Sequence, residues 1–170
     1  MKNLFNIKIY LFIFALLAST QVANSQIIDS SFYQWVVYEI NADDIEEKQC
    51  YIVSHPISSN SDHGSRKTPY IMITRFEKDR VEEISVYDGF EFKLNSQVFL
   101  LIDDHQFKLF AKKDIAWAGS KAEDVKIIQT ILNSAVIRVR ADSAVGTYAV
   151  DEYSLEGVTR AYARMREICR

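Results

Sequence analysis

The chain has 170 residues, of which 48% are hydrophobic, and its Lys and Arg residues number 20 against 23 Asp and Glu. This length suits one domain, and the apolar fraction excludes a disordered chain. The net charge of −3 argues against a general nucleic-acid-binding protein, and two cysteines exclude a four-thiolate zinc site or a dense disulfide scaffold.

The first 25 residues have the pattern of a secretory signal peptide. Lys2 and Lys8 precede or begin an apolar run over residues 9–18, and Ala23-Asn24-Ser25 offers small residues for cleavage. The run is about half the roughly 20 residues that span a bilayer, so an uncleaved anchor is the less favoured alternative. We therefore expect residues 26–170 to form a single exported domain, in the periplasm, at the outer membrane or secreted, with no transmembrane segment in the mature chain.

Cys50 and Cys169 are the two thiols of the chain. In an oxidising compartment an even count predicts a disulfide, here between an early strand and the last turn of the chain. In the chain-entropy model a loop of that length is worth roughly 4–5 kcal/mol. A reactive thiol or a bond to a partner remains the alternative.

Most of the mature chain has the pattern of short strands separated by turn signals. The Ser-rich segment 55–69, with its two prolines, is predicted to be a long exposed loop, and residues 41–48 an acidic turn. Trp35 and Trp117 are expected to be core anchors. The predicted strands cover residues 32–40, 49–54, 70–76, 81–87, 97–102, 106–111, 136–140 and 147–153.

Two segments predict helices. Ser120 and Glu123 form a capping box, after which Val125, Ile128 and Leu132 recur at helical spacing as far as a stop at Asn133. From residue 154 onwards, a second apolar stripe at helical spacing continues to the end of the chain. It comprises Leu155, Val158, Tyr162, Met165 and Cys169.

Together these elements predict a mainly β fold, an antiparallel β-sandwich with two short helices, the C-terminal one packed on the sheet. A partly open barrel is the alternative.

The residues alone show no convincing catalytic or metal-binding constellation. The loop residues His55, Asp62 and His63 resemble a ligand set weakly, and a solvated loop is the simpler interpretation. Asp103-Asp104-His105 contains an acid and a base, but its place between two predicted strands favours turn chemistry. We predict no catalytic residues, no metal and no cofactor.

One candidate contact surface stands out in the predicted loop. Arg66 and Lys67 lie close to Tyr70, a combination that suits an anionic lipid, a polysaccharide or a protein partner. Two charges in a loop are more often simply solvated. These three residues are the partner-binding site that the sequence predicts.

Short motifs spread from Trp35 to Cys169 resemble the invasion-associated locus B family of alphaproteobacterial exported proteins, in its shorter branch. Their order and spacing, more than any single motif, carry the resemblance. The longest lies near the C-terminus and reads Asp-x-Tyr-Ser-Leu-x-Gly. The motifs are Cys50-Tyr51, Ser54-x-Pro56, Arg66 with Tyr70, Thr74-Arg75, Glu83-Ile84-Ser85-Val86, Gly89-Phe90, Phe107-x-Leu109-Phe110, Ala116-Trp117, Asp151-x-Tyr153-Ser154-Leu155-x-Gly157, Ala161 and Cys169.

The resemblance implies a non-enzymatic envelope protein linked to host-cell invasion or colonisation, acting on a protein or cell-surface partner. The family has no established catalytic residues, so none is carried over. Cys50 and Cys169 match positions of an apparent structural disulfide. Two other functions stay open: a periplasmic structural or chaperone-like adaptor, which would expose an apolar groove, and a small secreted hydrolase, which would pair His105 with Asp103 in a cleft.

Overall fold

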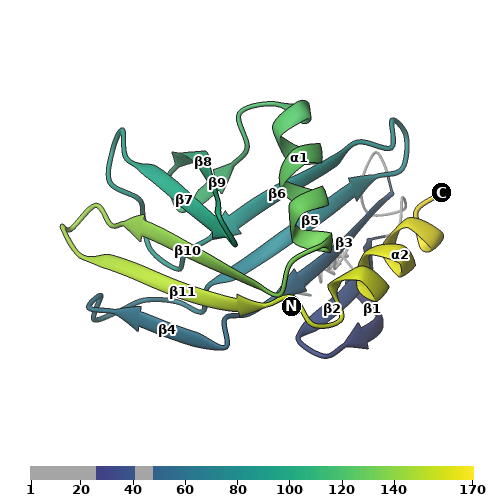
Figure 1. The fold of residues 1–170 in the computed structure, drawn as a ribbon, viewed down its shortest axis with the longest axis horizontal. Coiled ribbons are helices and arrows are strands. Elements are labelled where there is room, and N and C mark those ends of the chain that lie inside the picture. The colour runs from purple at the N-terminus through teal and green to yellow at the C-terminus, as the bar shows by residue number, and fades with distance from the viewer. Residues whose placement is uncertain (1–25, 41–47) are drawn as a thin grey trace, which may run out of the picture.

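The computed structural model describes residues 26–40 and 48–170, in which all strands belong to one antiparallel sheet (Figure 1). The predicted signal peptide and most of the predicted acidic turn lie outside these residues. The sheet order is β1-β2-β3-β5-β6-β9-β8-β7-β10-β11-β4. The elements are β1 (Gln26–Phe32), β2 (Trp35–Ile40), β3 (Gln49–Ser54), β4 (Ser58–Ser61), β5 (Tyr70–Phe76), β6 (Glu82–Tyr87), β7 (Gln97–Ile102), β8 (His105–Lys112), β9 (Ile115–Trp117), α1 (Lys121–Leu132), β10 (Val136–Asp142), β11 (Tyr148–Ser154) and α2 (Val158–Ile168).

The sheet folds over itself and encloses one hydrophobic core, so the sandwich-like, mainly β expectation is confirmed. Buried side chains from β2, β3, β5 and β6 pack in the same cluster as those from β7, β10 and β11. The indole Nε1 of Trp35 on β2 donates a hydrogen bond of 3.0 Å to the carbonyl oxygen of Ser154 on β11, which ties the two halves together. The sheet is not closed into a barrel, because β1 and β4 remain its two edges.

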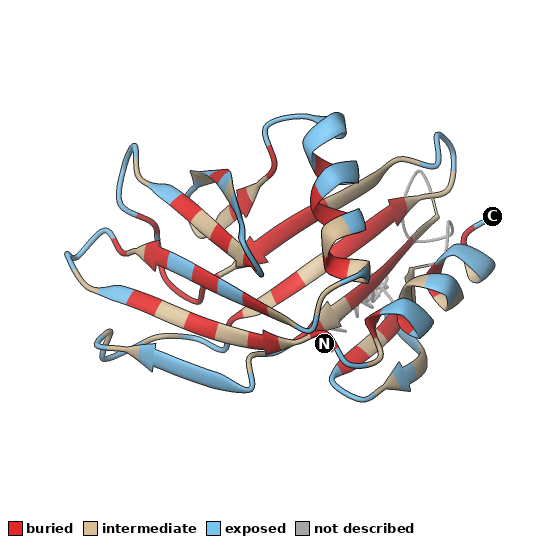
Figure 2. Ribbon diagram, viewed as in Figure 1, coloured by how far each residue is buried: buried red, intermediate tan, exposed pale blue. Residues whose placement is uncertain are grey.

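Alternation of side chains along the strands places the core on one face of each layer. Buried and more accessible residues alternate along β10 and β11, as the red bands of Figure 2 show. On β3, Cys50 and Ile52 face the core, so Tyr51 and Val53 point to the opposite face. Helix α2 packs its buried Val158, Ala161 and Met165 on the core side, against β1, β2 and β3.

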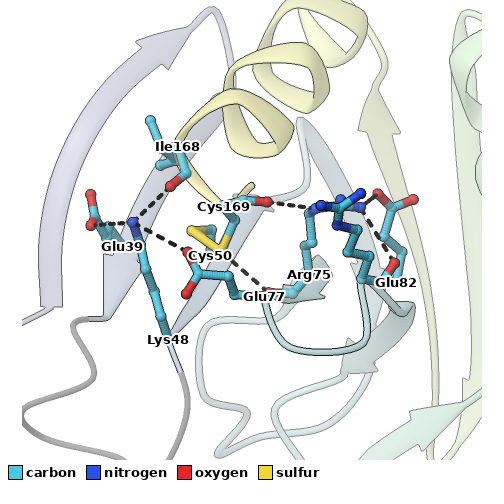
Figure 3. Close-up of a disulfide and its surroundings, with 9 residues drawn as sticks. Glu39, Lys48, Cys50, Arg75, Glu77, Glu82, Ile168 and Cys169 are labelled. Atoms are coloured by element: carbon cyan, nitrogen blue, oxygen red, sulfur yellow. Dashed lines mark hydrogen bonds and ion pairs between the residues drawn. A yellow bond between two sulfur atoms is a disulfide. The ribbon is translucent and has the colours of Figure 1, made fainter.

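The predicted disulfide is present between Cys50 and Cys169, which are 119 residues apart and have Cα atoms at 5.9 Å (Figure 3). Two cations hold the backbone on either side of it. The Lys48 ammonium donates to the carbonyl oxygen of Ile168 at 2.7 Å, and Arg75 Nε donates to that of Cys169 at 2.8 Å. The end of α2 is therefore fastened to β3 and β5 by a covalent bond and two charged donors.

Helix α1 forms where the sequence predicts it, whereas α2 begins at Val158 and not at residue 154, which is the last residue of β11. Ser120 accepts a hydrogen bond from the Glu123 amide, the Glu123 carboxylate accepts one from the Gly119 amide, and Asn133 ends the helix. The predicted apolar stripe of α1 is partly wrong, because Val125 is exposed. The buried face is Asp124, Ile127, Ile128 and Ile131.

Several sequence predictions on the strands need correction. The predicted strand over residues 32–40 is β2 only from Trp35 onwards, because the chain turns at Tyr33, which has φ 55°, and Phe32 ends the preceding strand β1, which was not predicted. The predicted loop 55–69 contains β4, which pairs with β11, and β9 was not predicted. Trp35 is fully buried, whereas Trp117 is half-buried and packs on Phe110 at a ring distance of 5.8 Å. Among the described residues, no helix combines the length and apolar character needed to cross a bilayer.

Candidate functional site: a tyrosine-lined groove

The part of the sheet formed by β1, β2, β3 and β5 carries a hollow of about 410 Å³ on the face away from α2. We call this hollow the tyrosine groove. Its side chains come from β1, β2, β3 and β5 and from the residue that follows β3. Among the lining residues that the structure describes, none is Lys, Arg, Asp or Glu. The lining residues are Gln26, Tyr38, Ile40, Gln49, Tyr51, Val53, His55, Tyr70, Met72 and Thr74.

Strand register brings the tyrosines together. Tyr38 and Tyr51 are direct cross-strand partners in β2 and β3, and their rings stack with centroids 4.9 Å apart and planes 9° from parallel. Tyr70 and Tyr87 are likewise partners in β5 and β6, with rings 5.0 Å apart. Directly opposed residues of an antiparallel pair lie on the same face, so the pairing itself builds the aromatic surface.

The Tyr51 and Tyr70 hydroxyls of the groove are uncharged donors at neutral pH. Burial, with smaller contributions from Tyr38 and Tyr70, raises the pKa of Tyr51 to about 12. Burial also raises the pKa of Tyr70, and Tyr87 and Asp114 add to the effect. The groove thus offers ring faces, ring edges and neutral hydrogen-bonding groups rather than ions.

His55 and Tyr70 form one end of the groove. The His55 Nδ1 atom is 2.8 Å from the carbonyl oxygen of Pro69, and its ring meets Tyr70 edge-on at 6.4 Å. These contacts join the two ends of the 55–69 segment. Because Tyr87, the stacking partner of Tyr70, lines a neighbouring hollow with Lys67 and Lys113, that hollow and the groove share the Tyr70–Tyr87 pair as a border.

The structure places the three predicted partner-binding residues in three different surroundings. Tyr70 lines the tyrosine groove, and Lys67 is exposed beside the neighbouring hollow. The Arg66 side chain is 8% exposed and is engaged by the carboxylates of Asp88 and Asp151. Of the three, Lys67 and Tyr70 are therefore presented to the surface, and partner binding by the trio stays a prediction.

The weaker sequence candidates are distributed over separate places. Asp103 has φ 49° at the tip of the β7–β8 hairpin and accepts a hydrogen bond of 2.6 Å from Ser134, while His105 stacks on Phe107. His63 stacks on Phe90, away from His55 at the groove. Within residues 26–40 and 48–170 no group of three or more His, Cys, Asp and Glu side chains is placed to hold a metal ion.

Comparisons of the chain with protein-family models, with curated proteins and with solved structures found no match. The resemblance to the invasion-associated locus B family therefore stays a prediction. Many residues that carry it are interior in this fold: Arg66 binds Asp151, Arg75 binds the Cys169 carbonyl, and Tyr153 is fully buried. These interior residues stabilise the fold of the domain and do not form its outer surface.

Proposed function

We propose that this chain is an exported, non-enzymatic protein of the cell envelope that binds a protein or cell-surface partner through the tyrosine groove and so supports host-cell invasion or colonisation. The observation that carries the binding part is the tyrosine-lined hollow on the face of the sheet opposite α2, whose described lining residues are all uncharged side chains or a histidine. The resemblance of the sequence supports the link to invasion.

Tyrosine suits such a surface for physical reasons. Its ring supplies a large contact area with two rotatable bonds, and its hydroxyl forms hydrogen bonds without a charge that must be desolvated. The groove volume of about 410 Å³ lies in the range of roughly 300–1,000 Å³ that is usual for ligand sites. A partner with neutral, apolar or aromatic groups fits this lining better than an anionic one.

Export is supported by the cysteine chemistry. Cys50 and Cys169 are both fully buried and joined, and such structural disulfides persist in oxidising compartments. The apolar run of residues 9–18 has the pattern of the secretory signal peptide that such export requires.

A specific observation favours the adaptor as the second candidate. Ile28 on the edge strand β1 lies directly opposite Tyr38, on the same face of the sheet, and is 63% exposed. The apolar surface of the groove thus continues to a sheet edge, where an extended segment of a client protein could pair with the backbone. Suppression of the aggregation of an unfolded test protein would support the adaptor, whereas binding to native surfaces without suppression would support the first proposal.

The test introduces a charge into the uncharged groove. We expect Met72→Glu, made in the mature domain, to weaken binding to envelope fractions and host-cell membranes by about tenfold or more, which corresponds to roughly 1.4 kcal/mol. The matched control is Val145→Glu, which places the same charge on a side chain that is 74% exposed in the β10–β11 turn. Circular dichroism and thermal melting verify that both variants fold.

Two outcomes would contradict the proposal. Equal binding by Met72→Glu and the unaltered protein would show that the groove is not the contact surface. Failure of the unaltered protein to bind either preparation in crosslinking would remove the proposed function itself.

A further inference from the structure

A second cluster of side chains lies at the opposite end of β5 from the disulfide, and it connects three parts of the fold. The Arg66 guanidinium, from the 62–69 loop, donates to both carboxylate oxygens of Asp151 on β11, with the Nη1–Oδ1 distance at 2.8 Å. It also donates to the Ser59 hydroxyl on β4 and to the backbone carbonyl of Asp88, the residue after β6. One side chain thereby ties the loop to both layers of the sheet.

The charges of this cluster do not balance. Asp88 and Asp151 are both fully buried, and in the described part of the chain Arg66 is the one cation that pairs with them. Asp151 forms the bidentate contact with Arg66. The Asp88 Oδ1 atom lies 3.0 Å from Arg66 Nη2, but the geometry there is not that of a hydrogen bond. Within the described residues neither carboxylate oxygen of Asp88 has a hydrogen-bond partner. With both carboxyls ionised, the interior would carry one uncompensated negative charge, which is costly in a low-dielectric surrounding.

We propose that Arg66, Asp88 and Asp151 form a proton-linked latch that holds the 62–69 loop on the sheet more firmly in acid than in alkaline solution. Adding a proton to Asp88 leaves a neutral acid beside a balanced Arg66–Asp151 pair. Removing it restores the excess charge beneath the loop.

The titration behaviour of the surrounding groups supports this assignment. Burial raises the pKa of Asp88 to about 7, because it outweighs the lowering by Arg66, and Asp151 raises it further. Burial also raises the pKa of Tyr153, which faces the cluster from β11 and stays uncharged. His63, which stacks on Phe90 at 5.1 Å, is the remaining titratable neighbour on the loop, while Phe90 itself lies under the Arg66 guanidinium.

The sign of the effect follows from linkage. The pKa of Asp88 is higher in the latched state than the ordinary 3.8, so the latched state binds more protons between those values. Its stability is fully present below about pH 4 and is lost as the pH rises through about 7. The latch therefore loosens on the alkaline side.

The backbone amide of Lys67 gives a direct measure of whether the loop is docked on the sheet. The Lys67 amide donates a 2.9 Å hydrogen bond to the Gly89 carbonyl, and Gly89, at φ 80°, lies so close to the Lys67 carbonyl that a β-carbon there would collide with it. This docking places Lys67 and the Tyr70–Tyr87 border of the groove. That the latch also tunes partner binding rests on the proposed function, whereas the latch itself does not.

The test is hydrogen exchange at the Lys67 amide, corrected for the intrinsic rate, at about pH 5.5 and about pH 8.5. We expect protection to fall by about tenfold or more over this interval in the unaltered protein. Asp88→Asn, which mimics the protonated acid, should abolish the dependence, while Asp104→Asn at an exposed hairpin tip should retain it. His63→Gln should also retain it.

Loss of the pH dependence in His63→Gln, or its persistence in Asp88→Asn, would overturn the latch. If Asp88→Asn does not fold, the carbon-13 titration of the Asp88 carboxyl in the unaltered protein decides the matter. A midpoint near 7 supports the proposal, and an ordinary midpoint near 4 contradicts it. None of these readouts involves a partner, so the latch and the proposed binding function fail separately.

Discussion

The two ends of β5 are held by different chemistry. At one end a buried disulfide fixes the last residues of the chain, and Lys48 and Arg75 bind the adjoining carbonyl oxygens. At the other end Arg66 joins a loop to both layers through ions and hydrogen bonds. The disulfide responds to redox conditions and the ionic cluster to pH, so one domain has two attachments that can be released independently.

The disulfide gives the larger expected effect. Replacing Cys50 and Cys169 together by Ala should lower the free energy of unfolding by roughly 4–5 kcal/mol, because the unfolded chain regains the entropy of a long closed loop. Denaturant unfolding of the variant and of the oxidised protein measures this difference. Equal stability of the two proteins, or a melting temperature that reductant does not change, would contradict the role given to the disulfide.

The ionic attachment is tested by removing its cation. Arg66→Met keeps much of the side-chain volume but leaves two buried carboxyls without a counter-ion, which should cost roughly 3–5 kcal/mol at neutral pH. The matched control is Arg138→Met, which breaks a surface pair with Glu152 and should cost less than about 1 kcal/mol. Similar losses in the two variants would show that the Arg66 cluster acts as an ordinary surface pair.

The two attachments also differ in how far the sequence predicts them. Two cysteines in a chain with a predicted export signal suggest their own pairing, whereas nothing in the spacing of Arg66 and Asp151 indicates a contact across 85 residues. The same contrast applies to the strands. β3, β5 and β7 match the predicted ranges because turn signals bound apolar runs, but β1 contains Asp29-Ser30-Ser31, and Asp29 is held by Arg164 from α2.

The tyrosine groove was missed for a related reason. Tyr38, Tyr51 and Tyr70 are visible in the sequence on three predicted strands, and Tyr70 was already a candidate contact residue. Which tyrosines share a face depends on the strand order and register, and the turn at Tyr33 that places β1 beside β2 was not predicted. A residue-by-residue search for charged or catalytic motifs also passes over a site built from neutral side chains.

Export followed by oxidation is the central proposal for this protein, and the intact mass of the protein recovered from the envelope fraction of its own cells tests it directly. We expect a chain that begins near Gln26 and is two hydrogen atoms lighter than its fully reduced form. Recovery of the chain with its first 25 residues attached and both thiols open to alkylation would contradict export, the disulfide and the proposed place of action together.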